Sequence, residues 1–275
     1  MKRILCSTGA LIGRSNGRDY RLLTGLADKI DCDGFELLMY DDWYSCADAL
    51  SECLYAIGKP FPSFHIEKDV GELISRNEEG DSEKALELFE KNCIIARSIG
   101  SEKLVLHLWN GVHSDKAFLH NMKMYAPLRD IAVKYGLLLT VENVVCNYAD
   151  PMSRLKELLY YYPDIAFTFD TKMAEFHGQL LDICKDENRA VWDHVAHLHI
   201  NDYKGGIKDW SSLKTLHIGE GQIVFGSLFS FVNSMGYDGD ITIESTSFGK
   251  TTGIIDADSM NSSIARVREL FDGRV

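Results

Sequence analysis

Residues 137–143 read LLLTVEN, residues 165–172 read IAFTFDTK, residues 195–202 read VAHLHIND and residues 241–246 read ITIEST. Each stretch contains a short apolar run that leads into a carboxylate or an imidazole. Apolar runs of about four to eight residues, rich in β-branched and aromatic side chains, are typical of strands buried on both faces in a parallel sheet. We therefore predict four buried parallel strands, each carrying a polar side chain at its end.

The same kind of run recurs earlier in the chain. Four more lie at residues 3–7, 34–39, 62–66 and 103–109, so eight strands are expected in all. Amphipathic stretches with helical periodicity lie between the runs. The clearest of them are residues 81–99, 118–135, 152–162, 227–235 and 257–271. Gly100, Gly136 and Gly236 directly follow three of these stretches, at the position where a glycine commonly ends a helix.

Strands that alternate with helices predict an α/β protein, with either a closed barrel or an open doubly wound sheet. Neither GxGxxG nor GxxxxGK[ST] occurs, which removes the usual nucleotide-binding motifs of the open class. The strand count and the length of 275 residues favour a single (β/α)₈ TIM barrel over residues 1–275. In such a barrel the functional side chains gather at the carboxyl ends of the strands.

The composition restricts the partners and the compartment. The net charge is −12 and no basic cluster stands out, so nucleic acid is not an expected partner. The seven cysteines are an odd number without a CxxC pair, which suits a reducing compartment. The apolar N-terminal run is interrupted by Arg14, and no apolar stretch is long enough to span a membrane. We expect a cytoplasmic protein without a membrane partner.

Four consecutive strands end in ionisable side chains, namely Glu142, Asp170, His199 and Glu244. Taken singly, a charged residue after a strand is more often solvated or paired with a neighbour. Three carboxylates and an imidazole that converge would repel one another without a counter-charge, which a divalent cation supplies. A mixed oxygen and nitrogen set without thiolate suits Mn²⁺, Mg²⁺, Co²⁺ or Zn²⁺. The sequence therefore predicts one divalent-metal site at this end of the barrel.

The earlier strands carry further ionisable residues. Glu36 lies in the second run, His65 and Glu67 in and after the third, His107 in the fourth, and His197 in the seventh. A histidine inside a strand is more often a hydrogen-bonded core residue than a metal ligand. The residue types alone therefore assign neither a structural nor a functional role to these positions.

The chain resembles the xylose-isomerase-like TIM-barrel superfamily of sugar isomerases and epimerases, which also contains the endonuclease IV class of apurinic-site nucleases. The resemblance covers nearly the whole chain. It rests on the order and spacing of TVEN at 140–143, FDT at 169–171, HLHIND at 197–202, IGEG at 218–221 and TIES at 242–245.

The resemblance implies roles for the four strand-end residues. Matching residues in the ketose 3-epimerases of this superfamily bind one metal, which implies Glu142, Asp170, His199 and Glu244 as ligands, with Mn²⁺ as the first choice of ion. The two glutamates would also form the acid/base pair, Glu142 and Glu244 standing on opposite faces of a bound sugar. The metal would hold the carbonyl and an adjacent hydroxyl and stabilise the enediolate.

Departures from the family pattern bear on the alternatives. Many relatives have a histidine at the position of Met173, and the nuclease relatives have an Asp-x-His where this chain has Leu213 and Thr215. A trinuclear nuclease site is therefore not expected. His65 and His107, which match nuclease zinc ligands, are then interpreted as contacts to substrate hydroxyls.

Other residues near the strand ends complete the predicted site. We expect substrate contacts from His65, His107, His177, Lys172, Trp109 and Glu220, with His177 replacing the missing histidine from its loop. The competing interpretation is plain packing for Trp109, solvation at the surface for Lys172, and a place in the turn formed by Gly219 and Gly221 for Glu220. Asp202 and Tyr203 are expected to support His199.

The leading functional prediction is a metal-dependent isomerase or epimerase of a sugar, a sugar acid or a related polyol. A dehydratase of an inosose-like substrate would begin with the same proton abstraction. An apurinic-site nuclease and a sugar-binding barrel without turnover are the remaining alternatives. The partner is expected to be a small sugar, without a phosphate because no arginine cluster is evident, and many relatives assemble as dimers or tetramers, which implies a homo-oligomer.

Overall fold

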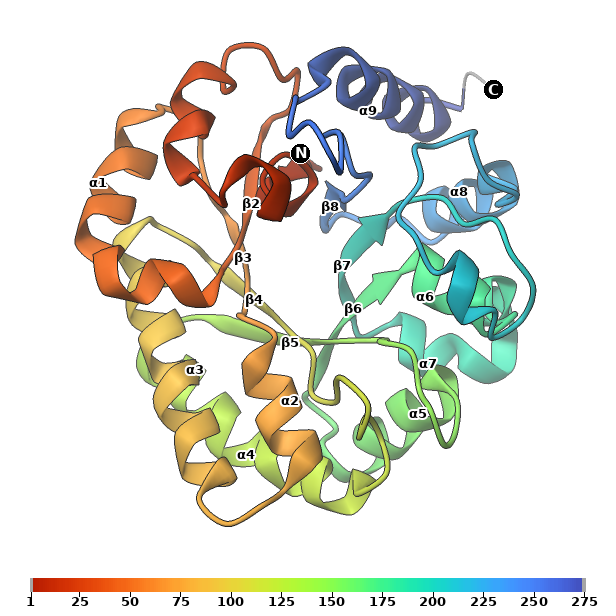
Figure 1. The fold of residues 1–275 in the computed structure, drawn as a ribbon. Coiled ribbons are helices and arrows are strands. Elements are labelled where there is room, and N and C mark those ends of the chain that lie inside the picture. Colours follow the sequence, from red (N-terminus) through yellow and green to blue (C-terminus); the bar gives the residue numbers. More distant parts are fainter. Residues whose placement is uncertain (1, 274–275) are drawn as a thin grey trace.

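A computed structural model describes residues 2–273 and shows a ring of parallel strands surrounded by helices (Figure 1). Within these residues eight strands form a closed barrel in chain order, and β1 pairs with both β2 and β8. The strands are β1 (Ile4–Ser7), β2 (Gly34–Leu38), β3 (Ser63–His65), β4 (Lys103–Leu106), β5 (Leu138–Glu142), β6 (Ala166–Asp170), β7 (Val195–Ile200) and β8 (Asp240–Ile243). The predicted (β/α)₈ barrel and all its strands are confirmed.

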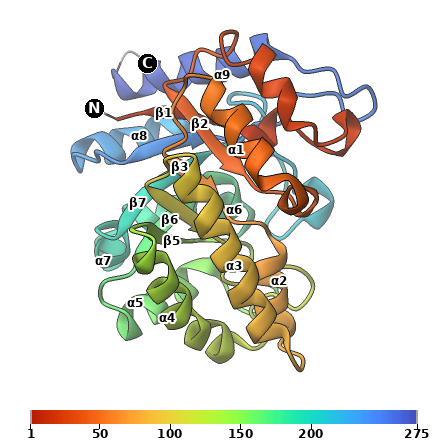
Figure 2. The ribbon, with the colours of Figure 1, turned by 90° about the vertical axis from the view of Figure 1, so that its left-hand side faces the viewer.

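Helices cover the outside of the barrel, as Figure 2 shows for α1 and α3. They are α1 (Ala47–Ala56), α2 (Asp69–Arg76), α3 (Asp81–Ser98), α4 (Phe118–Lys134), α5 (Pro151–Tyr161), α6 (Thr171–Phe176), α7 (Arg189–Trp192), α8 (Phe225–Ser234) and α9 (Ala257–Phe271). Helices α3, α4, α5, α8 and α9 confirm the five predicted stretches to within two residues. The remaining four are 4 to 10 residues long, too short for a clear periodicity in the sequence.

Helix ends follow the predicted glycines. Gly100, Gly136 and Gly236 have φ values of 79°, 68° and 63°, the left-handed conformation that glycine adopts without strain. The last helix, α9, completes the outer ring beside α8, and an ion pair of 2.6 Å from Arg268 to Asp31 ties it to the segment before β2. None of the helices in residues 2–273 combines the length and hydropathy needed to cross a bilayer.

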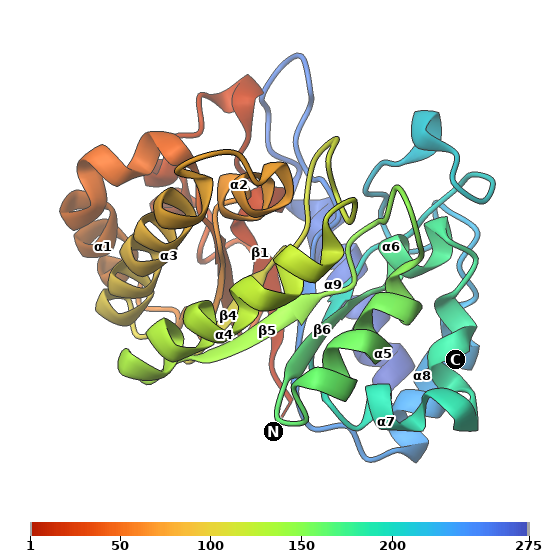
Figure 3. The same cartoon turned by 90° about the horizontal axis from the view of Figure 1, so that it is seen from below.

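Successive side chains along each strand point to opposite faces of the sheet. In β2, Phe35 and Leu37 are fully buried in the hydrophobic core, while Glu36 between them is also fully buried. Long loops rise from the end of the barrel opposite the N-terminus (Figure 3). Because all strands are parallel, their carboxyl ends meet beneath these loops, where the predicted site lies.

Candidate metal and catalytic site

The four predicted metal ligands come together at the carboxyl ends of β5 to β8. Glu142 ends β5, Asp170 ends β6, His199 lies in β7 and Glu244 directly follows β8. One ligand atom from each of the four lies within 4.8 Å of all the others. Neighbouring parallel strands therefore place at one point the side chains that are far apart in the sequence.

This cluster is buried and brings three carboxylates together beside the single ammonium of Lys172. Glu142, Asp170 and His199 are 1%, 0% and 0% exposed, and the side chain of Glu244 is 17% exposed. Nδ1 of His199 lies 3.4 Å from Oε1 of Glu142 and 3.4 Å from Oε1 of Glu244. Within residues 2–273 this Nδ1 makes no hydrogen bond. Buried charges without partners are costly, so the set fits a bound divalent cation.

The pKa values within the cluster show how strongly its members interact. Burial raises the pKa of Asp170 to about 6, with the carboxylates of Glu142 and Glu244 adding to the rise and the ammonium of Lys172 opposing it. Burial would also raise the pKa of Glu142, but His107 and His199 beside it hold that pKa well below its ordinary value. Burial would lower the pKa of His199, yet Glu244, Glu36 and Glu142 raise it well above the ordinary value. Such opposed shifts are common in functional sites.

Two asparagines hold Asp170 in place. Asn201 donates to Oδ2 of Asp170 at 3.1 Å, and the backbone N–H of Met173 donates to Oδ1 at 2.7 Å. Asn143 accepts a hydrogen bond from the backbone N–H of Asp170 and donates to its carbonyl. Sequence reasoning missed both asparagines, although each follows a strand end, in TVEN and in HIND.

His65 and His107 surround the other oxygen of Glu142. Oε2 of Glu142 lies 2.7 Å from Nε2 of His107 and 3.5 Å from Nε2 of His65. The three side chains form a second group close enough to hold a cation. Helix α2 packs closely against the segment that follows β4 and begins with His107. This approach requires a glycine at position 71, where a Cβ atom would lie 2.1 Å from the carbonyl oxygen of His107.

A cavity of about 400 Å³ opens above the cluster. Its lining includes Glu142, Glu244, His65, His107 and Lys172, so five of the predicted residues face one space. Lys172 is only 7% exposed, and within residues 2–273 its ammonium makes no hydrogen bond or ion pair. A cavity with a few convergent polar groups is typical of a small-molecule site.

A family model described as xylose isomerase-like TIM barrel matches residues 25–270. The chain belongs to this family. No curated protein matches it by sequence at a significant level.

Solved structures similar to this xylose isomerase-like barrel share its fold at low sequence identity. D-allulose 3-epimerase from Methylomonas sp. has a TM-score of 0.74 and 16% identity, with 98% of each chain covered. A D-tagatose 3-epimerase-like protein has a TM-score of 0.72 and 19% identity, with 99% of each chain covered. The IolI protein, whose structure holds a zinc atom, has a TM-score of 0.74 and 14% identity, with 99% of each chain covered.

Three predicted substrate contacts of this xylose isomerase-like barrel do not line the cavity. Trp109 is fully buried, donates to the carbonyl of Val144 at 3.1 Å and packs edge-on against Phe118. Nε2 of His177 accepts from the backbone N–H of Cys146 at 3.1 Å. Glu220 lies in an exposed turn and accepts from the backbone N–H of His217 at 3.1 Å. The positions of these two residues therefore agree with the competing interpretations, which are plain packing for Trp109 and a place in a turn for Glu220.

The expected support of His199 by Asp202 and Tyr203 is wrong. The carboxylate of Asp202 instead accepts hydrogen bonds from the backbone N–H groups of Tyr203, Gly219, Gly221 and Ile223. Gly221 packs so closely that a Cβ atom there would lie 2.3 Å from Oδ1 of Asp202. Asp202 therefore organises the loop around the IGEG turn, and the partner of His199 lies elsewhere in the barrel.

Proposed function

We propose that this protein is a divalent-metal-dependent isomerase or epimerase of a sugar or a related polyol or keto-sugar. The observation that carries the proposal is that two glutamates meet in the same candidate metal site. Oxygens of Glu142 and Glu244 lie at 3.4 Å from the same nitrogen of His199, at the floor of the cavity. A pure binding site has no need for two carboxylates that can each accept a proton.

The two glutamates come from β5 and β8, which β6 and β7 separate in the ring. A sugar bound between them would present one face to each carboxylate. One glutamate removes the proton from the carbon next to the carbonyl, and the other delivers a proton to the opposite face or to the neighbouring carbon. The first outcome inverts a stereocentre, and the second moves the carbonyl.

A bound divalent cation, with Mn²⁺ the first expectation and Mg²⁺, Co²⁺ or Zn²⁺ as alternatives, would polarise the carbonyl and so acidify the adjacent C–H bond. The chain would contribute the carboxylate oxygens of Glu142, Asp170 and Glu244 and the Nδ1 of His199 as ligands. Asn201 and the N–H of Met173 keep both oxygens of Asp170 oriented.

Residues around the cavity suit a neutral, hydroxyl-rich substrate. His65 and His107 can exchange hydrogen bonds with hydroxyl groups, and the ammonium of Lys172, which makes no hydrogen bond within residues 2–273, can donate to a carbonyl or alkoxide oxygen. Arg18 also lines the cavity, but its guanidinium is paired with Asp41 and Asp42, so no free arginine is available for a phosphate among the lining residues. The similarity in fold to a D-allulose 3-epimerase supports the same substrate class. We also propose that the protein is cytoplasmic and that it forms a homo-oligomer.

Deuterium exchange tests the proposal directly. The protein is incubated with Mn²⁺ in D₂O and a panel of ketoses, including D-allulose, D-tagatose and D-fructose, and the sugars are followed by NMR. We expect deuterium at C3 for an epimerase, or at C1 together with aldose formation for an isomerase. If no ketose exchanged and inososes lost water instead, the dehydratase alternative would replace the proposal. Cleavage of apurinic DNA would support the nuclease, and sugar binding without exchange would support an inactive barrel.

A further inference from the structure

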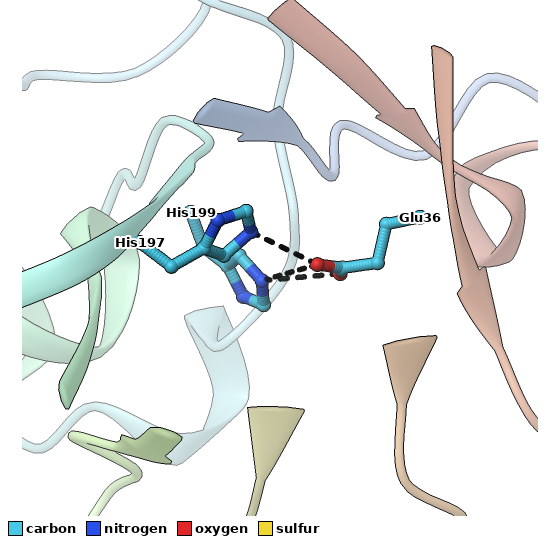
Figure 4. A group of neighbouring side chains, drawn as sticks. All are labelled: Glu36, His197 and His199. Carbon is cyan, nitrogen blue, oxygen red and sulfur yellow. Dashed lines mark hydrogen bonds and ion pairs between the residues drawn. The ribbon is translucent and has the colours of Figure 1, made fainter. Parts of the chain in front are cut away.

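Glu36 crosses the interior of the barrel to reach His199. It comes from β2, is fully buried, and its carboxylate faces His197 and His199 of β7 on the far side (Figure 4). Strands β2 and β7 are not neighbours in the ring, so the contact bridges the barrel. A buried carboxylate is costly unless hydrogen-bond donors stabilise it.

Hydrogen-bond donors surround the carboxylate. Oε2 accepts from the hydroxyl of Ser63 at 2.6 Å and from that of Thr242 at 3.2 Å. Nε2 of His197 lies 2.9 Å from Oε2, and Nε2 of His199 lies 3.3 Å from the same oxygen. Oε1 lies 3.1 Å from Nε2 of His199 but makes no hydrogen bond within residues 2–273. These donors all bond to Oε2, so Glu36, His197 and His199 form a hydrogen-bonded unit. The three side chains are also close enough together to hold a cation.

Lys103 fixes the tautomer of His197. Its Nζ lies 3.2 Å from Nδ1 of His197, and an ammonium can only donate, so Nδ1 must accept. The proton of a neutral His197 is therefore on Nε2, where it points to Glu36. Lys103 is itself held by the carbonyl of Ala196 at 3.0 Å and by Asp240 at 3.4 Å, and Asp240 accepts from Arg3 at 2.8 Å.

The same argument fixes His199. An ionised carboxylate can only accept, so the Nε2 of His199 that faces Glu36 carries the proton. The lone pair of a neutral His199 is then on Nδ1, which faces Glu142 and Glu244 and has no other hydrogen-bond partner in residues 2–273. Metal-binding histidines are commonly oriented in this way by a carboxylate on the second nitrogen.

We propose that Glu36 is a positioning residue of the metal centre: it holds the proton of His199 on Nε2 and thereby presents the Nδ1 lone pair to the cation. The inference rests on the metal site of the proposed function. His197, Lys103 and Asp240 hold Glu36 in turn and connect the centre to the opposite end of the barrel.

Metal affinity and histidine NMR test this role without any substrate. Mn²⁺ binding is measured by calorimetry for the wild-type protein, for Glu36→Gln and for Thr140→Val. Thr140 is a matched control, because it is a fully buried residue whose hydroxyl bonds to Leu104 and Thr168 and not to the metal cluster. We expect Glu36→Gln to weaken Mn²⁺ binding about 10- to 100-fold. We expect Thr140→Val to change it less than about threefold.

Long-range ¹H–¹⁵N spectra of the Zn²⁺-loaded wild-type protein give a second measurement that does not depend on a variant folding. We expect His199 to show a protonated Nε2 and a metal-bound Nδ1. A metal-bound Nε2, or a folded Glu36→Gln variant with wild-type Mn²⁺ affinity, would overturn the role of Glu36 and leave the proposed function intact. Failure of the wild-type protein to bind either ion would overturn both.

Discussion

Nε2 of His107 lies 2.7 Å from Oε2 of Glu142, a close contact outside hydrogen-bond geometry, while the other oxygen, Oε1, faces His199. The two oxygens thus belong to different groups of side chains. A single cation beside His199 leaves the contact with His107 intact, whereas a second cation between Glu142, His65 and His107 would have to replace it.

We therefore expect one divalent ion per chain. The measurement is elemental analysis of the purified protein after dialysis against Mn²⁺, with a sample treated with EDTA as the control. Two ions per chain would show that His65 and His107 act as metal ligands and would weaken their assignment to substrate hydroxyls. Because a divalent cation would offset the repulsion among the three buried carboxylates, we also expect EDTA to lower the melting temperature, and Mn²⁺ to restore it.

Glu244→Gln should keep the fold and remove proton transfer. The substitution preserves the shape of a side chain that is only 17% exposed, but an amide cannot take up the proton. We expect the rate of deuterium exchange into the best ketose to fall about 10³-fold at saturating Mn²⁺. The exposed Glu187→Gln variant is the control for a general loss of charge and should exchange at the wild-type rate. Wild-type exchange by Glu244→Gln would exclude this glutamate from the chemistry.

Lys172→Met tests the cation that faces the cavity. Its ammonium is almost fully buried beside the cluster, so a donor to a substrate oxygen would be lost while the apolar stem is kept. Loss of a charged hydrogen bond costs about 1.5–3 kcal/mol, which corresponds to about a 10- to 100-fold fall in kcat/KM. The exposed Lys204→Met variant serves as the comparison. Equal kcat/KM in the two variants would mean that Lys172 does not contact the substrate.

Glu67 should make stability depend on pH. Burial raises the pKa of Glu67 from 4.5 to about 7, with the nearby charge of Asp69 adding to the shift. The folded protein therefore binds this proton more tightly than the unfolded chain, and the corresponding stability is present below pH 4.5 and is lost as the pH rises through 7. Glu67→Gln removes the charge, so the variant should gain on the order of 2 kcal/mol over the wild-type protein at pH 8 relative to pH 5.

Urea unfolding of both proteins at the two pH values measures this difference. Glu87→Gln, at an exposed position of α3, is the matched control and should show no such change. An equal free-energy difference between Glu67→Gln and the wild-type protein at pH 5 and pH 8 would mean that Glu67 is charged in the folded state throughout.

Much of the fold could be predicted because the strands are buried on both faces. Their apolar runs are visible in the sequence, and the closed parallel arrangement brings Glu142, Asp170, His199 and Glu244 to one end. The convergence of these four candidate metal ligands was thus predictable without any knowledge of side-chain direction. Short helices such as α6 and α7 were not, since 6 and 4 residues are too few to show a periodicity.

Side-chain direction explains most of what could not be predicted. Strand β4 ends at Leu106, so Trp109 lies beyond it in a loop whose course the strand pattern does not fix, and it turns into the core. Asp202 lies beyond β7 for the same reason and serves the IGEG loop. Glu36 was visible as a charge within an apolar run, but its partners come from a strand more than 150 residues away, and only the closure of the barrel brings them together.

The bridge from Glu36 to His199 also bears on how this barrel can be divided. Glu36 and Lys103 belong to the first four strands, whereas His197, His199 and Asp240 belong to the last four. The metal-binding end and the opposite end are therefore joined by charges from both halves. Half-barrels exchanged between relatives would keep every proposed metal ligand of the last four strands and still lose Glu36, the carboxylate that we propose orients one of them. A chimera of this protein needs residues 36 and 103 to be inherited together with 197 and 199.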